Sequence, residues 1–252
     1  PLDTVIYVSA FASWLKSNFL NIQPKVVVGR DARISGPMIQ SLVNQTFVAY
    51  GIDVFDLGLS TTPTVEISVI ELKAQAGIII TASHNPKDWN ALKFIDHNGE
   101  ILSSKSVIDI LKIAEDKDFN YVGINYLGKI LPVEAMMERH IEKILGLSLV
   151  QSKAIQKKGF RVVLDAVNST GGIVVPQLLD ALGVEVVPLY CDPNGLFPHN
   201  PEPLKEHLSV LCQKVVEVKA DFGIVVDPDV DRLAFVDETG EMFGEEYTLV
   251  SC

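Results

Sequence analysis

The chain contains one pattern of residues twice, and this internal repeat constrains its fold more than any other feature. In the first copy an apolar run, residues 74–80, leads into Thr81-Ala82-Ser83-His84-Asn85-Pro86. In the second copy a similar run, residues 220–226, leads into Asp227-Pro228-Asp229-Val230-Asp231-Arg232. Each loop is followed by a hairpin-like segment, 92–100 and 233–241, that ends in Gly-Glu. Two similar folding units therefore follow one another, with Ser83 aligned opposite Asp229.

Strands and helices alternate within each copy. Apolar runs predict strands, and helical spacing of apolar residues predicts helices. Strands that alternate with helices form mainly parallel sheets with right-handed crossovers. The predicted fold class is α/β: two tandem copies of a similar mixed, mainly parallel α/β/α unit. The expected strands are 25–31, 52–57, 161–164, 184–189 and 223–226, and the expected helices are 5–20, 35–50, 64–72, 133–145, 173–182 and 204–219.

The length of 252 residues allows two domains that each bury a core. We place the first domain at residues 1–130 and the second, with its connecting helix, at residues 131–252. The polar stretch 151–159 is expected to be the approach to the second domain.

Charge and composition exclude several classes of partner. With 32 acidic and 21 basic residues the net charge is -11, whereas binding to nucleic acid requires clustered Lys and Arg. No apolar run approaches the roughly 20 residues of a membrane span. The cysteines Cys191, Cys212 and Cys252 are widely spaced and odd in number, which is typical of reduced thiols. We therefore expect a cytoplasmic protein that binds neither nucleic acid nor membrane.

The segment Asp227-Pro228-Asp229-Val230-Asp231 offers three carboxylates at alternate positions. Alternate side chains share one face of an extended backbone, and oxygen ligands on one face suit Mg²⁺. The competing interpretation is a solvated acidic turn. The preceding apolar strand and the following Arg232 favour the metal site.

The serine loop carries weaker signals. Ser83 and His84 are neighbours, but adjacent side chains point apart in extended backbone, so the segment taken alone is typical of a turn. The loop is five residues longer than its counterpart, and added length at the carboxyl end of a strand often serves function. Lys93 follows on the hairpin strand, where burial could lower its pKa and make it an acid or base; the alternative is a surface lysine.

Two arginines lie between the first strand and the following helix. Arg30 and Arg33 could bind an anion at this helix start, while Arg30 paired with Asp31 as scaffold is the alternative. The matching segment of the second copy, 168–172, lacks Arg and Lys and predicts capping of a helix. His199 is expected to line a proline-rich loop.

Taken together, the segments 81–86, 90–93 and 227–232 resemble the α-D-phosphohexomutase family, which includes phosphoglucomutase, phosphomannomutase and phosphoglucosamine mutase. The resemblance covers nearly the whole chain. It implies that Ser83 is a phosphoserine that helps to hold Mg²⁺ with the three aspartates, Asp227, Asp229 and Asp231.

The resemblance also implies the remaining roles and the reaction. Arg232 would contact phosphate, and Lys93 would be the general acid/base with His84 assisting. The family moves phosphate between O1 and O6 of a hexose. The implied ligands are therefore a hexose phosphate and a hexose bisphosphate.

The chain departs from the family pattern in ways that matter. Family members have four domains, and neither the third, with its sugar-recognition loop, nor the fourth, with its phosphate clamp, fits within this length. An arginine-bearing strand expected before Pro1 is missing, and Pro228 and Ala91 stand where glycines are usual. The Trp-Asn-Ala-Leu-Lys variant, 89–93, favours the phosphoglucosamine mutase branch of the family. We expect a fragment without turnover of its own that is able to self-associate.

Two other function classes stay open from the sequence. The strand followed by Asp227-Pro228-Asp229 also resembles a phosphoaspartyl-type, Mg²⁺-dependent phosphatase, but only about twenty residues remain after Arg232 for its further ligands. A non-catalytic two-domain module is the third class. It predicts neither phosphorylation of serine nor binding of metal.

Overall fold

The computed structural model describes residues 1–20, 22–244, 247–248 and 250. Contacts divide the chain into two compact units. The first unit comprises Pro1–Arg30, Ser35–Ile80 and Ala91–Met136, and the second comprises Asp31–Ile34, Thr81–Asn90 and Met137–Cys252. Two short segments of the first sequence copy therefore cluster with the second copy. The domain limits 1–130 and 131–252 stay a prediction.

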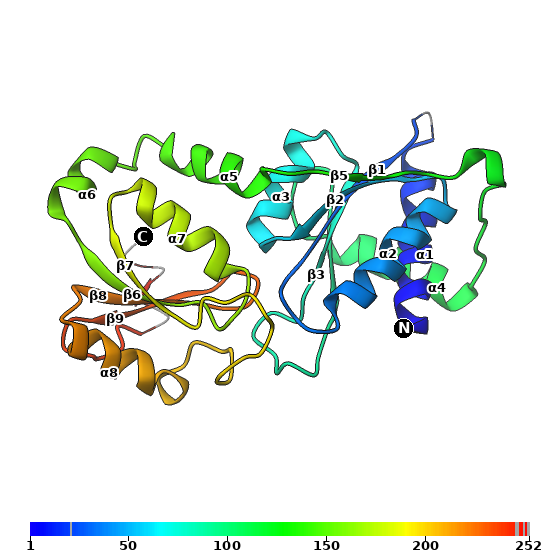
Figure 1. Ribbon diagram of the computed structural model, residues 1–252. Helices are drawn as coiled ribbons and strands as arrows, with labels where there is room; N and C mark the ends of the chain where they lie inside the picture. The colour runs from blue at the N-terminus through cyan, green and yellow to red at the C-terminus, as the bar shows by residue number, and fades with distance from the viewer. Residues whose placement is uncertain (21, 245–246, 249, 251–252) are drawn as a thin grey trace. The chain divides into compact units, whose positions relative to one another are not determined.

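The first unit contains a five-stranded sheet with the order β4-β3-β1-β2-β5 (Figure 1). β4 runs antiparallel to β3, and the other pairings are parallel. Its strands are β1 (Lys25–Arg30), β2 (Asp53–Leu59), β3 (Ala76–Ile80), β4 (Leu92–Ile95) and β5 (Ile130–Pro132). Its helices are α1 (Leu2–Asn18), α2 (Gly36–Ala49), α3 (Thr62–Glu71), α4 (Ser104–Asp116) and the short 3₁₀ helix η1 (Ile124–Tyr126).

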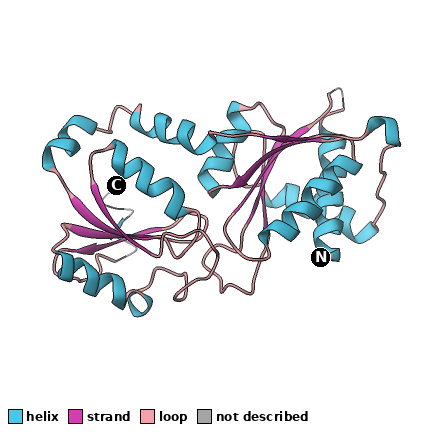
Figure 2. Cartoon of the chain, viewed as in Figure 1, coloured by secondary structure: helices cyan, strands magenta, loops and turns pink. Residues whose placement is uncertain are grey.

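The second unit contains a sheet with the order β7-β6-β8-β9, labelled in Figure 1, and Figure 2 draws its strands in magenta. If β6 to β9 are matched with β1 to β4, the order and the strand directions are the same in both sheets. The prediction of two tandem, mainly parallel α/β units is confirmed. The strands are β6 (Arg161–Asp165), β7 (Glu185–Leu189), β8 (Phe222–Val226) and β9 (Leu233–Asp237); the helices are α5 (Met136–Leu145), α6 (Ser152–Lys158), α7 (Gly171–Ala181), η2 (Lys205–His207) and α8 (Ser209–Val218).

Each sheet is covered by helices on both faces. In the first unit Val27 and Ile79 pack against Val65 and Val69 of α3, whereas α1, α2 and α4 pack with Val26 on the opposite face. In the second unit α8 covers one face and α7 the other. Burial of both faces explains why the central strands read as continuous apolar runs.

The repeat extends to individual hydrogen bonds in the hairpin turns. The N–H of Asp96 donates to the carbonyl of Glu100 (2.7 Å), and the N–H of Glu100 donates to Asp96 Oδ1 (3.1 Å). Asp237 and Glu241 make the same two bonds, both at 2.9 Å. The aspartate at the end of each edge strand therefore closes the turn in the same way.

Glycine occupies the same strand position in both units because a helix lies close to it. A Cβ atom on Gly77 would lie 2.7 Å from Val69 of α3, and one on Gly223 would lie 2.8 Å from Val215 of α8. Any larger residue would push the helix away from the sheet. This close packing sets the helix against each of the two central strands that lead into the loops.

Several predicted elements differ from the structure. The helix expected at 204–219 is divided, because Leu208 leaves the helical conformation (φ -111°) and is buried in the core. The stretch 151–159 contains α6, which has no fully buried residue and therefore no apolar face that periodicity could reveal. α4 and β5 were not predicted.

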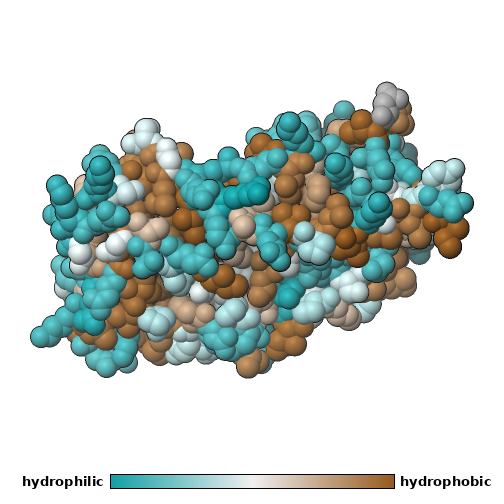
Figure 3. Space-filling model, turned by 45° about the horizontal axis from the view of Figure 1, so that its top comes forward, coloured by the Kyte–Doolittle hydropathy of each residue, from teal (hydrophilic) through white to brown (hydrophobic). Residues whose placement is uncertain are grey.

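The surface carries scattered apolar side chains. On the face shown in Figure 3 apolar residues lie between hydrophilic ones. Over the described residues, Ile124 and Leu149 are among the most exposed large apolar side chains. Isolated exposed apolar residues are ordinary and carry no functional argument. Cys191 and Cys212 are free thiols, and Cys252 lies outside the described residues. Among the residues that the structure describes, no helix combines the length and apolar character needed to cross a membrane.

Candidate phosphoryl-transfer site

The loop between β8 and β9 brings three carboxylates together. Oxygen atoms of Asp227, Asp229 and Asp231 lie within 4.8 Å of one another. Asp227 and Asp229 are fully buried, whereas Asp231 is exposed. The loop is a turn and not the predicted extended segment, because the N–H of Val230, with φ +63°, donates to the carbonyl of Asp227 (3.1 Å). A tight turn gathers the three side chains.

Electrostatic repulsion is large in this carboxylate cluster. Burial raises the pKa of Asp227 to about 8, and the charges of Asp229 and Asp231 add to the rise. Such a group keeps a proton at neutral pH unless a cation takes its place. Carboxylate oxygens are the ligands that Mg²⁺ prefers, so the donor set fits the predicted metal.

Hydrogen bonds from neighbouring backbone orient the first carboxylate. The N–H groups of Asp231 and Arg232 both donate to Asp227 Oδ1 at 3.1 Å. The second oxygen, Oδ2, faces the serine loop, as described below. The loop thus presents a fixed carboxylate edge.

Two buried hydroxyls hold the same loop from α7. Ser169 Oγ donates to the carbonyl of Pro228 at 2.7 Å, and Thr170 Oγ1 donates to it at 2.9 Å. The predicted capping role of segment 168–172 is wrong, because Thr170 is the N-cap residue and makes no side-chain cap bond. These hydroxyls hold the Asp loop, residues 227–232, a role that the sequence interpretation missed.

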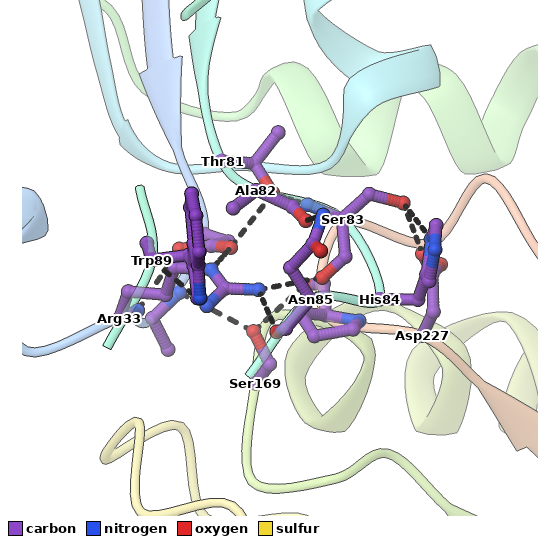
Figure 4. Close-up of polar contacts among 12 residues, drawn as sticks. Arg33, Thr81, Ala82, Ser83, His84, Asn85, Trp89, Ser169 and Asp227 are labelled. Carbon is purple, nitrogen blue, oxygen red and sulfur yellow. Dashed lines mark hydrogen bonds and ion pairs between the residues drawn. The ribbon is translucent and has the colours of Figure 1, made fainter. Parts of the chain in front are cut away.

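Ser83 points towards the carboxylate cluster (Figure 4). Its Oγ donates to Asp227 Oδ2 at 3.0 Å and lies 3.3 Å from Nδ1 of His84. Ser83 has φ +50°, a left-handed conformation that is uncommon outside glycine. This conformation lets the neighbouring side chains of Ser83 and His84 converge, where an extended backbone would separate them.

A buried arginine holds the serine loop, residues 81–91. Arg33 is only 1% exposed. Its Nη1 donates to the carbonyls of Pro86 (2.7 Å) and Trp89 (3.0 Å), and its Nη2 donates to those of Ser83 (2.6 Å) and Asn85 (2.7 Å) (Figure 4). Four carbonyls of one loop therefore converge on one guanidinium.

The fifth N–H of this guanidinium, on Nε, donates to Asp31 Oδ2 at 3.0 Å. Thr81 Oγ1 donates to the same carboxylate oxygen (2.8 Å) and accepts from the N–H of Ser83 (2.9 Å). Phosphate binding by Arg33 stays a prediction, and in this arrangement the guanidinium has no N–H left for a phosphate. Sequence reasoning named Asp31 only as a possible scaffold partner of Arg30, whereas it pairs here with Arg33, and it did not single out Thr81.

The segment 31–34 that carries this arginine is anchored within the second unit. The N–H of Ala32 donates to Ser169 Oγ at 3.3 Å. Gly195 lies so close that a Cβ atom there would be 2.1 Å from the carbonyl oxygen of Ala32. The guanidinium of Arg33 lies over the ring of Phe197, 5.1 Å from its centroid.

His199 fixes the loop that contributes Gly195 and Phe197. Its Nε2 lies 3.0 Å from Oδ2 of buried Asp165, and its Nδ1 lies 2.7 Å from the carbonyl of Asn200. Burial lowers the pKa of His199, but the hydrogen bond and charge of Asp165 outweigh burial and raise it overall. His199 therefore connects its loop to the end of β6, whereas the sequence interpretation expected it only to line the loop.

The other predicted site residues lie as follows. Arg232 follows the carboxylate cluster directly, and its Nη1 is 3.8 Å from Glu202 Oε1. Arg30 ends β1 in the first unit, where its Nε donates to Gln40 (2.9 Å). Lys93 lies on β4 of the first unit, paired in register with Ile79. The second unit thus assembles Ser83, His84, Arg33, Arg232 and the three aspartates.

Comparison with known proteins identifies two matching family descriptions. Residues 4–121 match "Phosphoglucomutase/phosphomannomutase, alpha/beta/alpha domain I", and residues 138–240 match domain II of the same family. The second match contains the whole Asp loop, 227–232. This favours the mutase interpretation over the phosphatase alternative.

Individual proteins with similar sequences carry related names. A "Phosphoglucomutase/phosphomannomutase" of Thermococcus kodakarensis is 36% identical over 90% of this chain, and a "Probable phosphoglucosamine mutase" of Pyrococcus horikoshii is 39% identical over 89%. The alignments cover 49% and 48% of these relatives, so the chain spans about half the length of the curated relatives it matches.

A solved structure agrees with the sequence matches. The phosphoglucomutase/phosphomannomutase family protein of Burkholderia thailandensis aligns with a TM-score of 0.82 at 28% identity. The alignment covers 96% of this chain and 52% of that chain. Both matched domains therefore have counterparts in a known structure.

Proposed function

Because the chain belongs to the phosphoglucomutase/phosphomannomutase family, we propose that it supplies the phosphoserine and the metal site of a phosphohexomutase. The proposed reaction interconverts hexose 1-phosphate and hexose 6-phosphate through a bisphosphorylated sugar. One observation carries the proposal: the hydroxyl of Ser83 lies 3.0 Å from Asp227 within a buried carboxylate cluster. The proposed nucleophile, Ser83, therefore lies beside the three aspartates that we assign to the metal.

The three aspartates, with an oxygen of phosphorylated Ser83, are the residues we assign to Mg²⁺. When bound there, Mg²⁺ would neutralise charge between the phosphoserine, near -2, and the carboxylates. The backbone bonds of Asp231 and Arg232 to Asp227 keep the carboxylate edge in place before any ligand arrives. Preformed positioning is the main contribution that phosphoryl transfer requires of a protein.

In the transfer step a hydroxyl of the sugar attacks the phosphorus of phosphoserine. The new P–O bond to the sugar forms, the bond to Ser83 Oγ breaks, and the sugar hydroxyl gives its proton to a base. We assign Lys93 as this general acid/base and His84, 3.3 Å from Ser83 Oγ, as an assisting group at the leaving oxygen. Arg232 is assigned to contact phosphate, and Arg30 is a further candidate for that contact.

The proposed ligands are a hexose phosphate and its bisphosphate. The segment Trp89–Lys93 favours a phosphoglucosamine among the hexose phosphates. Binding of the sugar and its non-reacting phosphate supplies energy that aligns the reacting oxygen. Since the chain spans about half of its relatives, we propose that those contacts come from further domains and that this chain alone does not turn over hexose phosphates.

The test is phosphorylation and replacement of Ser83 in the protein that contains this chain together with the remaining half of the family's length. Intact mass should show phosphate on the peptide with Ser83, and Ser83→Ala should abolish hexose phosphate turnover while the circular dichroism spectrum is unchanged. Ser17→Ala, at an exposed hydroxyl of α1, is the matched control and should keep full activity. Turnover by Ser83→Ala at the wild-type rate would overturn the proposal.

A further inference from the structure

We infer that Arg33 is the positioning residue of the serine loop: its guanidinium binds four loop carbonyls and so holds Ser83 Oγ towards Asp227. The loop-holding part of this inference stands on geometry alone. Its catalytic consequence rests on the proposed function. Arg33 then acts through Ser83 and does not itself bind the phosphate.

The four carbonyls belong to two separate short turns of the loop. The N–H of Asn85 donates to the carbonyl of Ala82 (3.0 Å) in the first turn, and the N–H of Trp89 donates to that of Pro86 (3.0 Å) in the second. Nη2 of Arg33 binds carbonyls of the first turn, and Nη1 binds those of the second. The planar fork of one guanidinium therefore joins the two turns.

Lysine could not replace this arrangement. An ammonium group is a point charge with three donors, whereas guanidinium presents five donors in a fixed plane. The Arg33 donors reach four carbonyls and the Asp31 carboxylate at 2.6–3.0 Å. A lysine could still neutralise Asp31 but would leave loop carbonyls without their donors, which costs free energy at each one that water does not reach.

The buried charge is compensated before any substrate binds. Asp31 is fully buried and accepts from both the N–H and Nε of Arg33, at 2.9 and 3.0 Å. Burial of a charged guanidinium is tolerated when it is paired and its donors are satisfied. If Arg33 turned towards a phosphate, Asp31 would lose its paired charge and the loop carbonyls would lose their donors. This cost disfavours binding of phosphate by Arg33.

One hydroxyl ties this arginine to the metal loop. Ser169 Oγ accepts from the N–H of Ala32, next to Arg33, and donates to the carbonyl of Pro228, next to Asp227. The position of Ser83 relative to Asp227 therefore depends on a continuous set of hydrogen bonds. Arg33 and Thr81 are the members of this set that reach Ser83, Arg33 through its carbonyl and Thr81 through its N–H.

The experiment compares Arg33→Lys with Arg161→Lys, whose arginine pairs with Glu185 near the surface of the same unit. In this chain, Arg33→Lys should make the amides of residues 81–90 exchange hydrogen at least roughly 10-fold faster, with the strands of the second unit unchanged. In the protein with all domains it should lower kcat about 100-fold, the scale of a misplaced reacting group, and leave KM within about 3-fold. Arg161→Lys should change none of these.

Each other outcome has a defined meaning. Unchanged loop exchange would overturn the inference, and a raised KM for the bisphosphate with unchanged kcat would make Arg33 a phosphate ligand instead. Faster exchange with unchanged kcat would overturn the catalytic consequence. If wild-type protein has no mutase activity, the proposed function fails while loop exchange still tests the positioning role. If Arg33→Lys does not fold, Thr81→Val, which removes the bonds to Ser83 N–H and Asp31, tests the same set.

Discussion

The two copies of the repeat hold equivalent loops by different means. The Asp loop has six residues, 227–232, between β8 and β9; it closes on itself through the carboxylate of Asp227, and one of its carbonyls, that of Pro228, is held by the hydroxyls of Ser169 and Thr170. The serine loop has eleven residues, 81–91, between β3 and β4, and it is held by Arg33 from another segment. A longer loop carries more carbonyls and a larger entropy of closure. It therefore requires a partner from elsewhere in the chain.

The difference shows that copies in sequence are not the units in space. The framework of strands, helices and hairpin turns repeats closely, while the serine loop clusters with the second unit together with the segment 31–34. The residues that we assign to the proposed function lie where the copies differ. The hydroxyl of Ser83 reaches the Asp227 carboxylate because residues 81–90 pack with the second unit and not with their own copy.

The largest expected loss of stability comes from replacing Gly195, which allows a close contact with Ala32. Gly195 has φ +73°, and its Cβ would clash with Ala32, so Gly195→Ala should lower the free energy of unfolding by about 3 kcal/mol. Gly159, at φ +62° with open space around it, is the matched control and should cost only about 1 kcal/mol as alanine. Denaturant titration of both variants checks this. Equal costs would mean that the Gly195 contact is not required.

A smaller loss is expected for Ser169→Ala, which removes the hydroxyl shared by the two loops. The variant leaves the Ala32 N–H without its acceptor and removes one of the two hydroxyl donors of the Pro228 carbonyl, which keeps Thr170, at about 2 kcal/mol. Hydrogen exchange should rise in both loops, 81–91 and 227–232. The exposed Ser17→Ala change should cost less than about 0.5 kcal/mol. A response confined to one loop would show that the loops are held independently.

The carboxylate cluster predicts a pH dependence of stability. The folded pKa of Asp227, about 8, lies above its ordinary value of 3.8, so between these values the folded state binds more proton than the unfolded state. Without metal, the free energy of unfolding should therefore fall as pH rises from 5 to 8, by up to about 1 kcal/mol per pH unit.

Magnesium and one substitution sharpen this test. Saturating Mg²⁺ should remove the slope, because the cation replaces the proton. Asp229→Asn should make the slope shallower, because it removes one of the charges that raise the pKa of Asp227. Thermal melts at several pH values, with and without Mg²⁺, check both. A flat metal-free profile would show that the cluster is a solvated turn.

The smallest effect concerns the equivalent hairpin turns. The hydroxyl of Thr239 donates to Asp237 Oδ1 (2.6 Å) and is the main reason that the pKa of Asp237 is lowered. Thr239→Val should raise this pKa in an NMR titration, while Asn98→Val, at the matching position of the first copy, should leave it unchanged. Because the folded pKa of Asp237 is lowered, its ionised carboxylate stabilises the folded state at pH values above the unfolded pKa. This stabilisation is lost as the pH falls through the folded pKa. An unchanged Asp237 pKa in Thr239→Val would place the cause in the backbone bonds instead.

Sequence reasoning located the parts that depend on local pattern. The strands into Ser83 and Asp227, and the hairpins after them, follow from apolar runs and turn residues within about ten positions. α6 was missed because no face of it is buried, and α8 was extended too far because Leu208 keeps helical spacing while it turns into the core. Asp31 and Thr81 each directly follow a buried strand, which is a signal that the sequence interpretation used for Asp31 only as a partner of Arg30 and did not use for Thr81.

The sequence by itself determined the repeat, the order of strands and helices, and the residue types at the ends of two equivalent strands. Only the tertiary structure decided which groups serve as partners. Ala32 and Ser169 are 137 positions apart, Ser83 and Asp227 are 144 apart, and Arg33 reaches carbonyls about fifty positions away. Backbone carbonyls are the same in every residue, so no residue type marks the four that bind Arg33. The buried donors of Arg33 must be satisfied, and packing of the whole unit chooses the carbonyls that satisfy them.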